Sequence, residues 1–301
     1  MIVRVLGSAA GGGVPQWNCA CPNCGAARQG RAPRRTQASL AISEDGARWL
    51  LLNVSPDVTQ HIEAFPPLQP SGVRGTPIIG ALITDANVDH LGGLAHLRQE
   101  GPHRFTIRSS ALVRAIAVEQ PAFAAFAHPP HAWLETPLDD GAACAPRDID
   151  DPVGHEWIVR AIPVPGLAPG FAGRRAERGA VVAYEIEVRS GARLLYAPVF
   201  STIDRPLADT ARRADIVFLD GSFHDDDEMD RMGLGRKRAR DLGHQPVSGG
   251  TLAFAATLSN RRLFTHLNNS NPLLDPSSPA ARAVREAGCE LAEDGLEIHL
   301  T

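Results

Sequence analysis

Short apolar segments that end in Asp, Asn or His recur along the sequence. The segments IIGALIT (78–84), ADIVFLDGS (214–222) and RRLFTHLNN (261–269) are rich in aliphatic and β-branched residues and have the length of strands. In layered α/β folds, ligands bind in the loops that follow strand ends. The polar residues at these ends are therefore the first place to look for a functional site.

The remaining patterns also indicate a mixture of strands and helices. Strands are expected at 2–8, 104–110 and 296–300, and helices at 90–99, 111–120 and 277–288. Two hairpins are expected at 39–54, around an Asp-Gly turn, and at 181–199, around Ser190 and Gly191. Segments 139–154 and 165–179 are rich in Pro, Gly and charge, and they predict long surface loops.

Composition excludes several classes of protein. The 301 residues carry 30 basic and 34 acidic side chains, without a basic stripe, so a nucleic-acid partner is not expected. No apolar run approaches the length of a membrane span, and the first residues read as a strand rather than a signal peptide. We expect a cytoplasmic protein with no membrane insertion.

Three of the five cysteines lie within six positions, as Cys19, Cys21 and Cys24. In a reducing compartment such spacing favours metal ligation over a disulfide framework. Thiolates favour zinc, and three of them supply three of the four positions of a closed tetrahedral site. Cys144 and Cys289 stand alone and are expected to be buried and inert.

The first polar cluster follows the strand that ends at Thr84. Asp85, Asn87, Asp89 and His90 bring several oxygen and nitrogen ligands to one strand end. Asp89 could instead cap the helix after it, but capping leaves the other three residues unexplained.

A second set of polar residues lies in the last third of the chain. Asp220 ends a strand, His244 precedes a Ser/Gly turn and His266 ends another strand. The run HDDDE (224–228) is interpreted as a solvated acidic loop. The remaining histidines that we assign to structural roles are His61, His96, His103, His155 and His299.

Five ordered motifs carry a resemblance to a known family. LGSAAGGGVPQWNCACPNC, TDANVDH, FLDGSFHDDDEM, LGHQPVSGG and THLNNSNPLLD are similar to the pyrroloquinoline quinone (PQQ) biosynthesis protein B family, of the metallo-β-lactamase fold. The resemblance implies an α/β protein built as an αββα sandwich, with two facing mixed sheets and helices outside. It also implies one domain over residues 1–301, with a Cys-rich zinc loop at 17–26.

The resemblance also predicts which metal ligands remain. The superfamily motif His-x-His-x-Asp-His places its first two histidines on Asp85 and Asn87, whereas Asp89 and His90 match. The usual bridging Asp falls near Pro198, and the final His falls on His266. Because a two-metal hydrolytic centre needs both ions, hydrolysis is disfavoured. Asp89, His90 and His266 form instead a two-His, one-carboxylate set, which is typical of Fe(II) oxygenases, although zinc could also bind it.

The resemblance further implies an Fe²⁺- and O2-dependent hydroxylase acting on the tyrosine ring of a glutamate-tyrosine intermediate, a small peptide-derived PQQ precursor. His244 would be an acid/base or a fourth ligand, and Asp85, Asn87 and Asp220 would orient ligands or substrate. The cysteine cluster would hold a structural Zn²⁺, with Asn269, water or another His in the fourth position. A homodimer is compatible with the sequence.

Two other functions stay open at this stage. A carrier that binds PQQ or its precursor on the way to the periplasm would need a cationic pocket, which Arg174, Arg175 and Arg178 could supply, although a solvated basic loop is the simpler interpretation. A metal-dependent hydrolase is disfavoured by the missing ligands. Segment 169–175 and His224 depart from the family pattern on loops near the strand ends, so a relative acting on another peptide is a further alternative.

Overall fold

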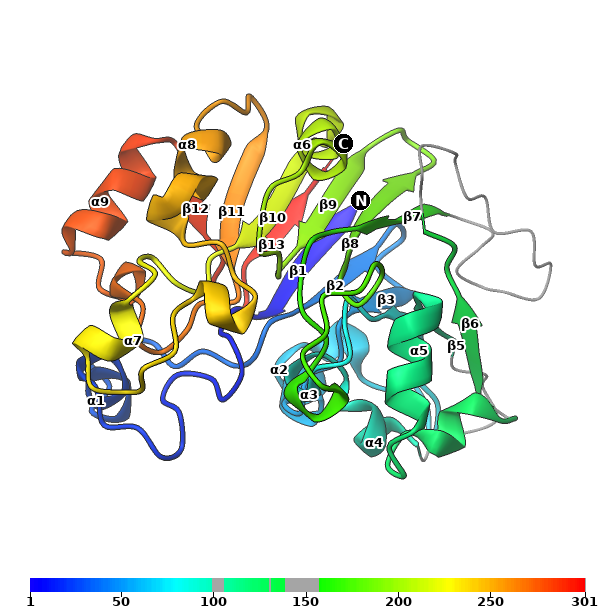
Figure 1. The fold of residues 1–301 in the computed structure, drawn as a ribbon. Coiled ribbons are helices and arrows are strands. Elements are labelled where there is room, and N and C mark those ends of the chain that lie inside the picture. Colours follow the sequence, from blue (N-terminus) through cyan, green and yellow to red (C-terminus); the bar gives the residue numbers. More distant parts are fainter. Residues whose placement is uncertain (99–105, 130, 139–156, 301) are drawn as a thin grey trace.

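The computed structural model describes residues 1–98, 106–129, 131–138 and 157–300. The predictions for segment 139–154, for Cys144 and for His103 and His155 fall outside this part of the chain. Two β-sheets face each other, and helices cover their outer surfaces (Figure 1). The predicted αββα sandwich is confirmed.

The first sheet contains seven strands in the order β13-β1-β2-β3-β4-β5-β6. The strands β13, β1, β2 and β3 are antiparallel neighbours, whereas β3, β4, β5 and β6 run parallel. The strand bounds are β1 Ile2–Gly7, β2 Ser39–Ser43, β3 Trp49–Leu52, β4 Ile78–Leu82, β5 Thr106–Ser109, β6 Ala132–Glu135 and β13 Glu297–His299.

The second sheet contains six strands in the order β12-β11-β10-β9-β8-β7. Here β7, β8 and β9 are antiparallel, and β9, β10, β11 and β12 are parallel. The bounds are β7 Trp157–Pro163, β8 Val182–Val188, β9 Arg193–Ala197, β10 Ile216–Asp220, β11 Arg261–Thr265 and β12 Glu290–Leu291. Both sheets are therefore mixed, as the fold class predicts.

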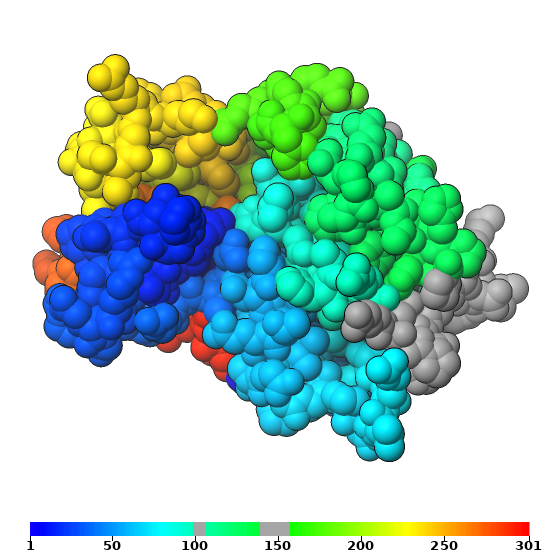
Figure 2. Space-filling model, turned by 90° about the horizontal axis from the view of Figure 1, so that it is seen from below, coloured from blue at the N-terminus to red at the C-terminus, as the bar shows by residue number. Residues whose placement is uncertain are grey.

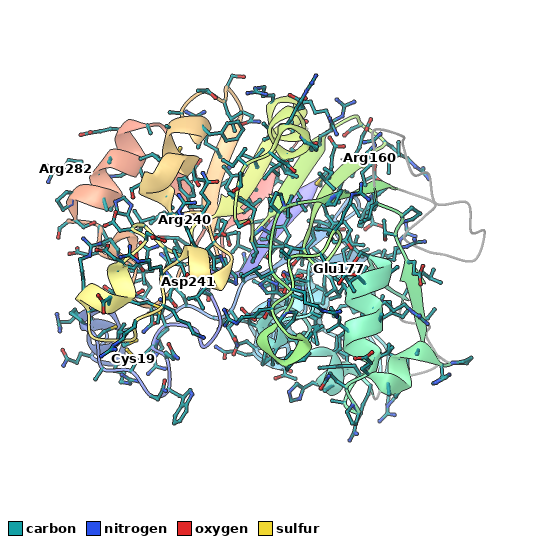
Figure 3. All side chains as sticks on the ribbon, viewed as in Figure 1. Cys19, Arg160, Glu177, Arg240, Asp241 and Arg282 are labelled. Carbon is teal, nitrogen blue, oxygen red and sulfur yellow. The ribbon has the colours of Figure 1, made fainter. Side chains whose placement is uncertain are left out.

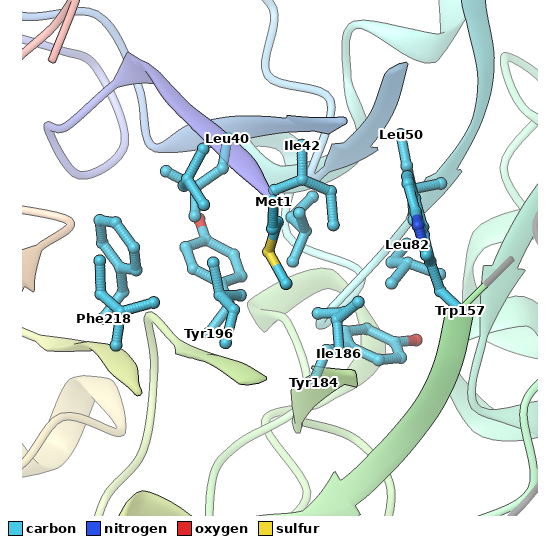
Figure 4. Packing of buried hydrophobic residues seen from close by; sticks show 14 of the residues in the cluster. Met1, Leu40, Ile42, Leu50, Leu82, Trp157, Tyr184, Ile186, Tyr196 and Phe218 are labelled. Atoms are coloured by element: carbon cyan, nitrogen blue, oxygen red, sulfur yellow. The ribbon is translucent and has the colours of Figure 1, made fainter. Parts of the chain in front are cut away.

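The main core lies between the sheets. Leu40, Ile42 and Leu50 from the first sheet face Tyr196 and Phe218 from the second (Figure 4). All five are fully buried, and each apolar side chain of this size stabilises the fold by about 1.5–3 kcal/mol when it leaves water. Strands β2, β3 and β10 are buried on both faces, so successive side chains along each strand alternate between this core and the one beneath the helices.

Two further cores bind the helices to the outer faces. One lies beneath α2 and α5 on the first sheet, and the other beneath α6 and α9 on the second. Ser110 and Ser278 cap α5 and α9 by accepting the backbone N–H of the third residue of each helix, Val113 and Ala281. The helix bounds are α1 Pro22–Arg28, α2 Val58–Ala64, α3 Val88–Leu91, α4 Leu94–Leu97, α5 Ala111–Val118, α6 Arg205–Arg213, α7 Glu228–Arg231, α8 Leu252–Ala255 and α9 Pro279–Glu286.

The helix predicted at 90–99 is wrong in its extent. Two four-residue helices, α3 and α4, replace it, and Gly92 and Gly93 lie between them. A side chain at Gly93 would lie 2.1 Å from the backbone oxygen of Ser55, so this close approach requires glycine. α3, which carries Asp89 and His90, ends at Leu91, and the N–H of Gly93 donates to the carbonyl of Val54.

Candidate metal centre

Polar side chains from both sheets meet at one edge of the sandwich. Asp85 follows β4, Asp220 is the last residue of β10, and His266 directly follows β11. The carboxyl ends of these strands lie at the lower edge of both sheets, between α1 and α7 on one side and α3 on the other (Figure 1). Seen from below, the N-terminal loop, the segment near residue 230, the loop near residue 170 and the segment near residue 90 meet on this face (Figure 2). The strand ends therefore form one site.

His90 is held with one ring nitrogen free. Its Nδ1 lies 2.5 Å from the Asp85 carboxylate, whose other oxygen accepts from the backbone and side-chain N–H groups of Asn87. Its Nε2 is buried and has no hydrogen-bond partner among the described residues. A buried ring nitrogen without a partner is destabilising unless a ligand occupies it. A carboxylate on the opposite nitrogen is the usual support of a metal-binding His.

His266 is oriented in the same way by a hydroxyl group. Ser222 donates its Oγ–H to Asp220 at 2.6 Å, so this oxygen accepts from Nδ1 of His266 at 2.7 Å. The lone pair of His266 Nε2 then faces a carboxylate oxygen of Asp89 at 3.2 Å. Two acceptors at that distance repel each other unless a proton or a cation lies between them. His266 also has a φ of +60°, a strained backbone conformation that is common at functional sites.

His244 completes the group of three imidazoles. Asp220 accepts a hydrogen bond from its Nδ1 at 2.8 Å, and its ring stacks on that of His266 with centroids 5.6 Å apart. Asp220 thus holds His244 directly and His266 through Ser222. Each of the three histidines therefore has its Nδ1 occupied and its Nε2 available for a ligand.

Charge within the site favours a bound cation. Burial opposes ionisation of Asp85 and Asp89, but His90 outweighs it and lowers the pKa of both carboxyl groups. Burial likewise opposes a charge on His90, but the two carboxylates raise its pKa to about 9. Burial, together with the neighbouring His90 and His244, lowers the pKa of His266. The two carboxylates therefore favour binding of a cation at this site, whereas the imidazole of His266 stays neutral and can donate its lone pair.

Two overlapping sets of side chains have metal-binding geometry. Asp89, His90 and His266 offer ligand atoms within 4.8 Å of one another, and so do Asp220, His244 and His266. In the second set Asp220 already accepts from His244, so the first set has more free ligand atoms. Asp89, His90 and His266 are two imidazoles and one carboxylate, and they suit a divalent first-row metal with positions left open.

A small pocket of about 210 Å³ opens over these residues. Leu167, Val199, Phe223 and Leu242 form its apolar walls, and Arg174 is also in its lining. Its volume lies below the 300–1,000 Å³ that is usual for sites that enclose a drug-sized ligand. The pocket therefore accepts one ring or side chain rather than a large molecule.

The three clustered cysteines form a second, separate group. The Sγ atoms of Cys19, Cys21 and Cys24 lie within 4.8 Å of one another, and all three side chains are buried. Asn269 places its amide group over them, with Nδ2 3.0 Å from the Cys19 sulfur and 3.4 Å from the Cys24 sulfur. Burial and the neighbouring thiols raise the pKa of Cys21 to about 11. Three thiolates cannot coexist here without a cation, and a zinc ion fits this donor set.

The cysteine cluster connects the N-terminal loop to the loop of His266. Asn23 donates to the backbone carbonyls of Asn269 and Asn271 at 2.9 and 3.0 Å. Met232 and Leu234, which follow α7, pack against the cysteines, and α1 and α7 lie side by side (Figure 1). The cluster therefore supports the segment that carries His266 without reaching the pocket itself.

Several sequence interpretations are refined by these contacts. Asn87, not Asp89, occupies the N-cap position of α3, so capping does not explain Asp89. The acidic run 224–228 is only partly solvated, because Glu228 is buried and accepts from Ser270. Arg174, Arg175 and Arg178 are exposed, but Arg174 and Arg178 each line a pocket. Ser222 was not predicted; its position two residues after Asp220 was the available signal.

Other residues have purely structural surroundings. His61 is buried and bonds the Thr36 hydroxyl at 2.8 Å, and Cys289 is buried in the core beneath α9. Within the described ranges, no helix has both the length and the apolar character needed to cross a lipid bilayer.

The chain is similar to known proteins over its full length. A family model described as "Beta-lactamase superfamily domain" matches residues 48–267. "Coenzyme PQQ synthesis protein B" of Azotobacter vinelandii is 38% identical over 312 residues, with all of both chains covered. The protein of the same name from Klebsiella pneumoniae (strain 342) is 37% identical over 309 residues, which cover all of this chain and 98% of that one.

Solved structures give the same result. The crystal structure of Zn(2+)-bound PqqB from Methylobacterium extorquens, at 35% identity, superposes with a TM-score of 0.90 and full coverage of both chains. A diphosphatase of the PhnP family, at 20% identity, has a TM-score of 0.66 over all of this chain and 98% of that one, and it shares the fold.

Proposed function

Since the chain belongs to the coenzyme PQQ synthesis protein B family, within the β-lactamase superfamily, we propose that it is an Fe²⁺- and O2-dependent hydroxylase in PQQ biosynthesis. Its substrate would be a small tyrosine-containing, peptide-derived intermediate, with glutamyl-tyrosine as the first candidate. Asp89, His90 and His266 would hold the iron.

The observation that carries this proposal is the set of unsatisfied ligand atoms at the pocket floor. The buried Nε2 of His90 has no hydrogen-bond partner in the described part of the chain, and Nε2 of His266 faces Asp89 lone pair to lone pair. Two imidazoles and one carboxylate are the donors of the non-haem Fe(II) oxygenases. When bound, ferrous iron would supply the O2 activation that ring hydroxylation requires, and an external two-electron reductant would be needed to reduce the second oxygen atom to water.

The chain's own residues would orient the metal ligands and manage a proton. Asp85 would keep His90 directed at the metal, and Asn87 would hold Asp85 in turn. His244, fixed at Nδ1 by Asp220, would accept at Nε2 the proton that leaves the ring carbon when a hydroxyl group replaces it. Leu167, Val199 and Phe223 would enclose the ring and exclude water.

The donor set does not favour hydrolysis by two bridged metals. Asp85 and Asn87 stand where the superfamily motif has its first two histidines, and Asp85 is already engaged by His90. Pro198 has no ligand atom to bridge two ions. A zinc ion in the cysteine cluster would stabilise the fold rather than take part in the reaction.

The direct test is the product formed with labelled oxygen. Protein loaded with Fe²⁺ without O2 is mixed with L-glutamyl-L-tyrosine and ascorbate as the two-electron reductant, isotopically labelled O2 is admitted, and the product is analysed by mass spectrometry. We expect one labelled oxygen atom on the tyrosine ring, and none with His90→Ala. Tight binding of PQQ or of the peptide without O2 consumption would support a carrier instead.

A further inference from the structure

Among the residues that the structure describes, the lining of the metal-site pocket contains a single Lys or Arg side chain. Its polar lining consists of Asn87, Ser222 and Asn268, the residues of the metal site and Arg174. A negatively charged ligand that enters next to Asp89 would be repelled by that carboxylate. Arg174 is therefore the group in the described lining that can attract and hold an anionic substituent.

The backbone conformation of Arg174 and one hydrogen bond of its guanidinium group hold this residue in place. It follows Gly173 in the loop between β7 and β8, and both residues have left-handed backbone conformations, with φ values of +86° and +48°. Such a conformation is unfavourable for arginine and needs support from its surroundings. One guanidinium nitrogen donates to the Asp241 carbonyl at 2.9 Å, which ties the loop to the short 3-10 helix η4 (Arg240–Leu242). Figure 3 labels Asp241 in this yellow segment and Glu177 in the green loop.

The remaining guanidinium donors of Arg174 stay available. No carboxylate of the described residues lies within ion-pair distance of this side chain, and its bond to Asp241 uses one of five N–H groups. The next residue, Arg175, differs in both respects. It pairs with Glu177 at 3.8 Å and does not line the pocket.

We propose that Arg174 binds a carboxylate of the substrate at the mouth of the pocket and makes the protein specific for aromatic carboxylic acids or peptides with a carboxylate close to the ring. The apolar walls would take the ring, and the guanidinium group would take the carboxylate through two parallel hydrogen bonds. The small volume leaves room for one ring with a short acidic tail. This inference rests on the proposed function only in taking the pocket as the substrate site.

The test compares two ligands that differ only in charge. N-acetyl-L-tyrosine carries a carboxylate, and N-acetyl-L-tyrosinamide carries a neutral amide in its place. Their affinities for the Fe²⁺-loaded protein are measured by calorimetry without O2. We expect the carboxylate to bind about 10- to 100-fold more tightly, as hydrogen bonds to a charged group predict.

Variants then assign this preference to one side chain. Arg174→Gln should remove the preference and Arg174→Lys should keep part of it, whereas Arg175→Gln is the matched control and should leave it unchanged. Metal content and melting temperature are measured for each variant, so that a folding defect is recognised. These affinities are measured without O2, so they do not depend on turnover. If the protein shows this pattern but forms no hydroxylated product in the labelled-oxygen experiment, the proposed function is contradicted and the role of Arg174 stands.

Several outcomes would overturn the inference. One is equal affinity of the intact protein for both compounds, or no measurable affinity for either. Another is a preference that survives in Arg174→Gln but disappears in His90→Ala, because the carboxylate would then be bound by the metal. An equal loss in Arg174→Gln and Arg175→Gln would point to the general charge of the loop.

Discussion

Asp85 lies 2.5 Å from Nδ1 of His90, and the buried Nε2 of that ring, which lines the pocket, has no hydrogen-bond partner among the residues that the structure describes. In the superfamily motif this position is itself a metal-binding His. Here the carboxylate bonds the ring of His90, and we propose that it supports a metal ligand instead of being one. Under the proposed function, this single relationship would change a two-metal arrangement into a site for one ion with open positions.

Replacing Asp85 by Asn should weaken the binding of Fe²⁺ at the pocket site. The amide keeps the shape of the carboxylate but loses the charge that orients His90 and makes it basic, so Fe²⁺ affinity should fall by about 10- to 100-fold. The measurement is anaerobic titration with Fe²⁺. Asp45→Asn, in the turn between β2 and β3 far from the site, is the matched control and should bind iron as the intact protein does. Unchanged affinity in Asp85→Asn would contradict this role.

Asp220→Asn should affect turnover more than metal content. Asp220 accepts from His244 and, through Ser222, keeps the tautomer of His266. Without its charge, His244 becomes a weaker base, and the hydroxylation rate should fall by about 100-fold or more. The rate of product formation and the iron content are measured on the same sample. A variant that loses iron as fully as His90→Ala would show that Asp220 acts on the metal rather than on the proton.

Loss of the cysteine cluster should loosen the N-terminal loop. Cys24→Ser removes one thiolate ligand, so the variant should lose its zinc, and limited proteolysis should cut more readily within residues 11–35. Cys289→Ser, at a buried cysteine remote from the cluster, is the control and should retain zinc. Full zinc retention in Cys24→Ser would contradict the assignment of the cluster as a metal site.

Glu228 should make stability depend on pH. Burial raises the pKa of this carboxyl group from 4.5 to about 7, although Ser270 and two backbone N–H groups favour its ionised form. The folded state therefore holds a proton that the unfolded state releases between about pH 4.5 and 7. Over that window the contribution of Glu228 to the free energy of unfolding falls by about 3 kcal/mol as pH rises. Above and below the window this contribution does not change with pH.

The difference between the intact protein and Glu228→Gln isolates that contribution. Denaturant unfolding is followed from pH 4 to 8, and the free energy of unfolding of the intact protein should decline relative to the variant as pH rises. Glu63→Gln, at an exposed position, controls for the loss of one carboxylate. A constant difference between the intact protein and Glu228→Gln across this range would refute the raised pKa.

Most of the fold follows from local sequence patterns. The strands 2–7, 78–82, 216–220 and 261–265 and the two hairpins are marked by apolar and β-branched runs with turn residues between them. No local pattern marks the four-residue helices α3 and α4, because the break between them depends on contact between Gly93 and Ser55, which are far apart in the sequence. Such contacts leave no periodic signal.

The site was predictable in its members but not in its pairings. The sequence identifies Asp85, Asp89, His90 and His266 as polar residues at strand ends. It does not reveal that Ser222 bonds His266 across 44 positions, or that Glu228 is buried against Ser270 across 42. The pairing of β10 with β11 brings these partners together, and this pairing exists only in the folded chain.

The cysteine cluster and the pocket site should bind their metals independently, and metal analysis of three proteins tests this. Metal content per chain is determined after anaerobic loading with Fe²⁺ for the intact protein, for His90→Ala and for the variant with Cys19, Cys21 and Cys24 replaced by Ser. We predict about one zinc and one iron in the intact protein, zinc alone in His90→Ala, and iron alone in the cysteine variant. Absence of iron from the intact protein, or loss of both metals in His90→Ala, would contradict the account.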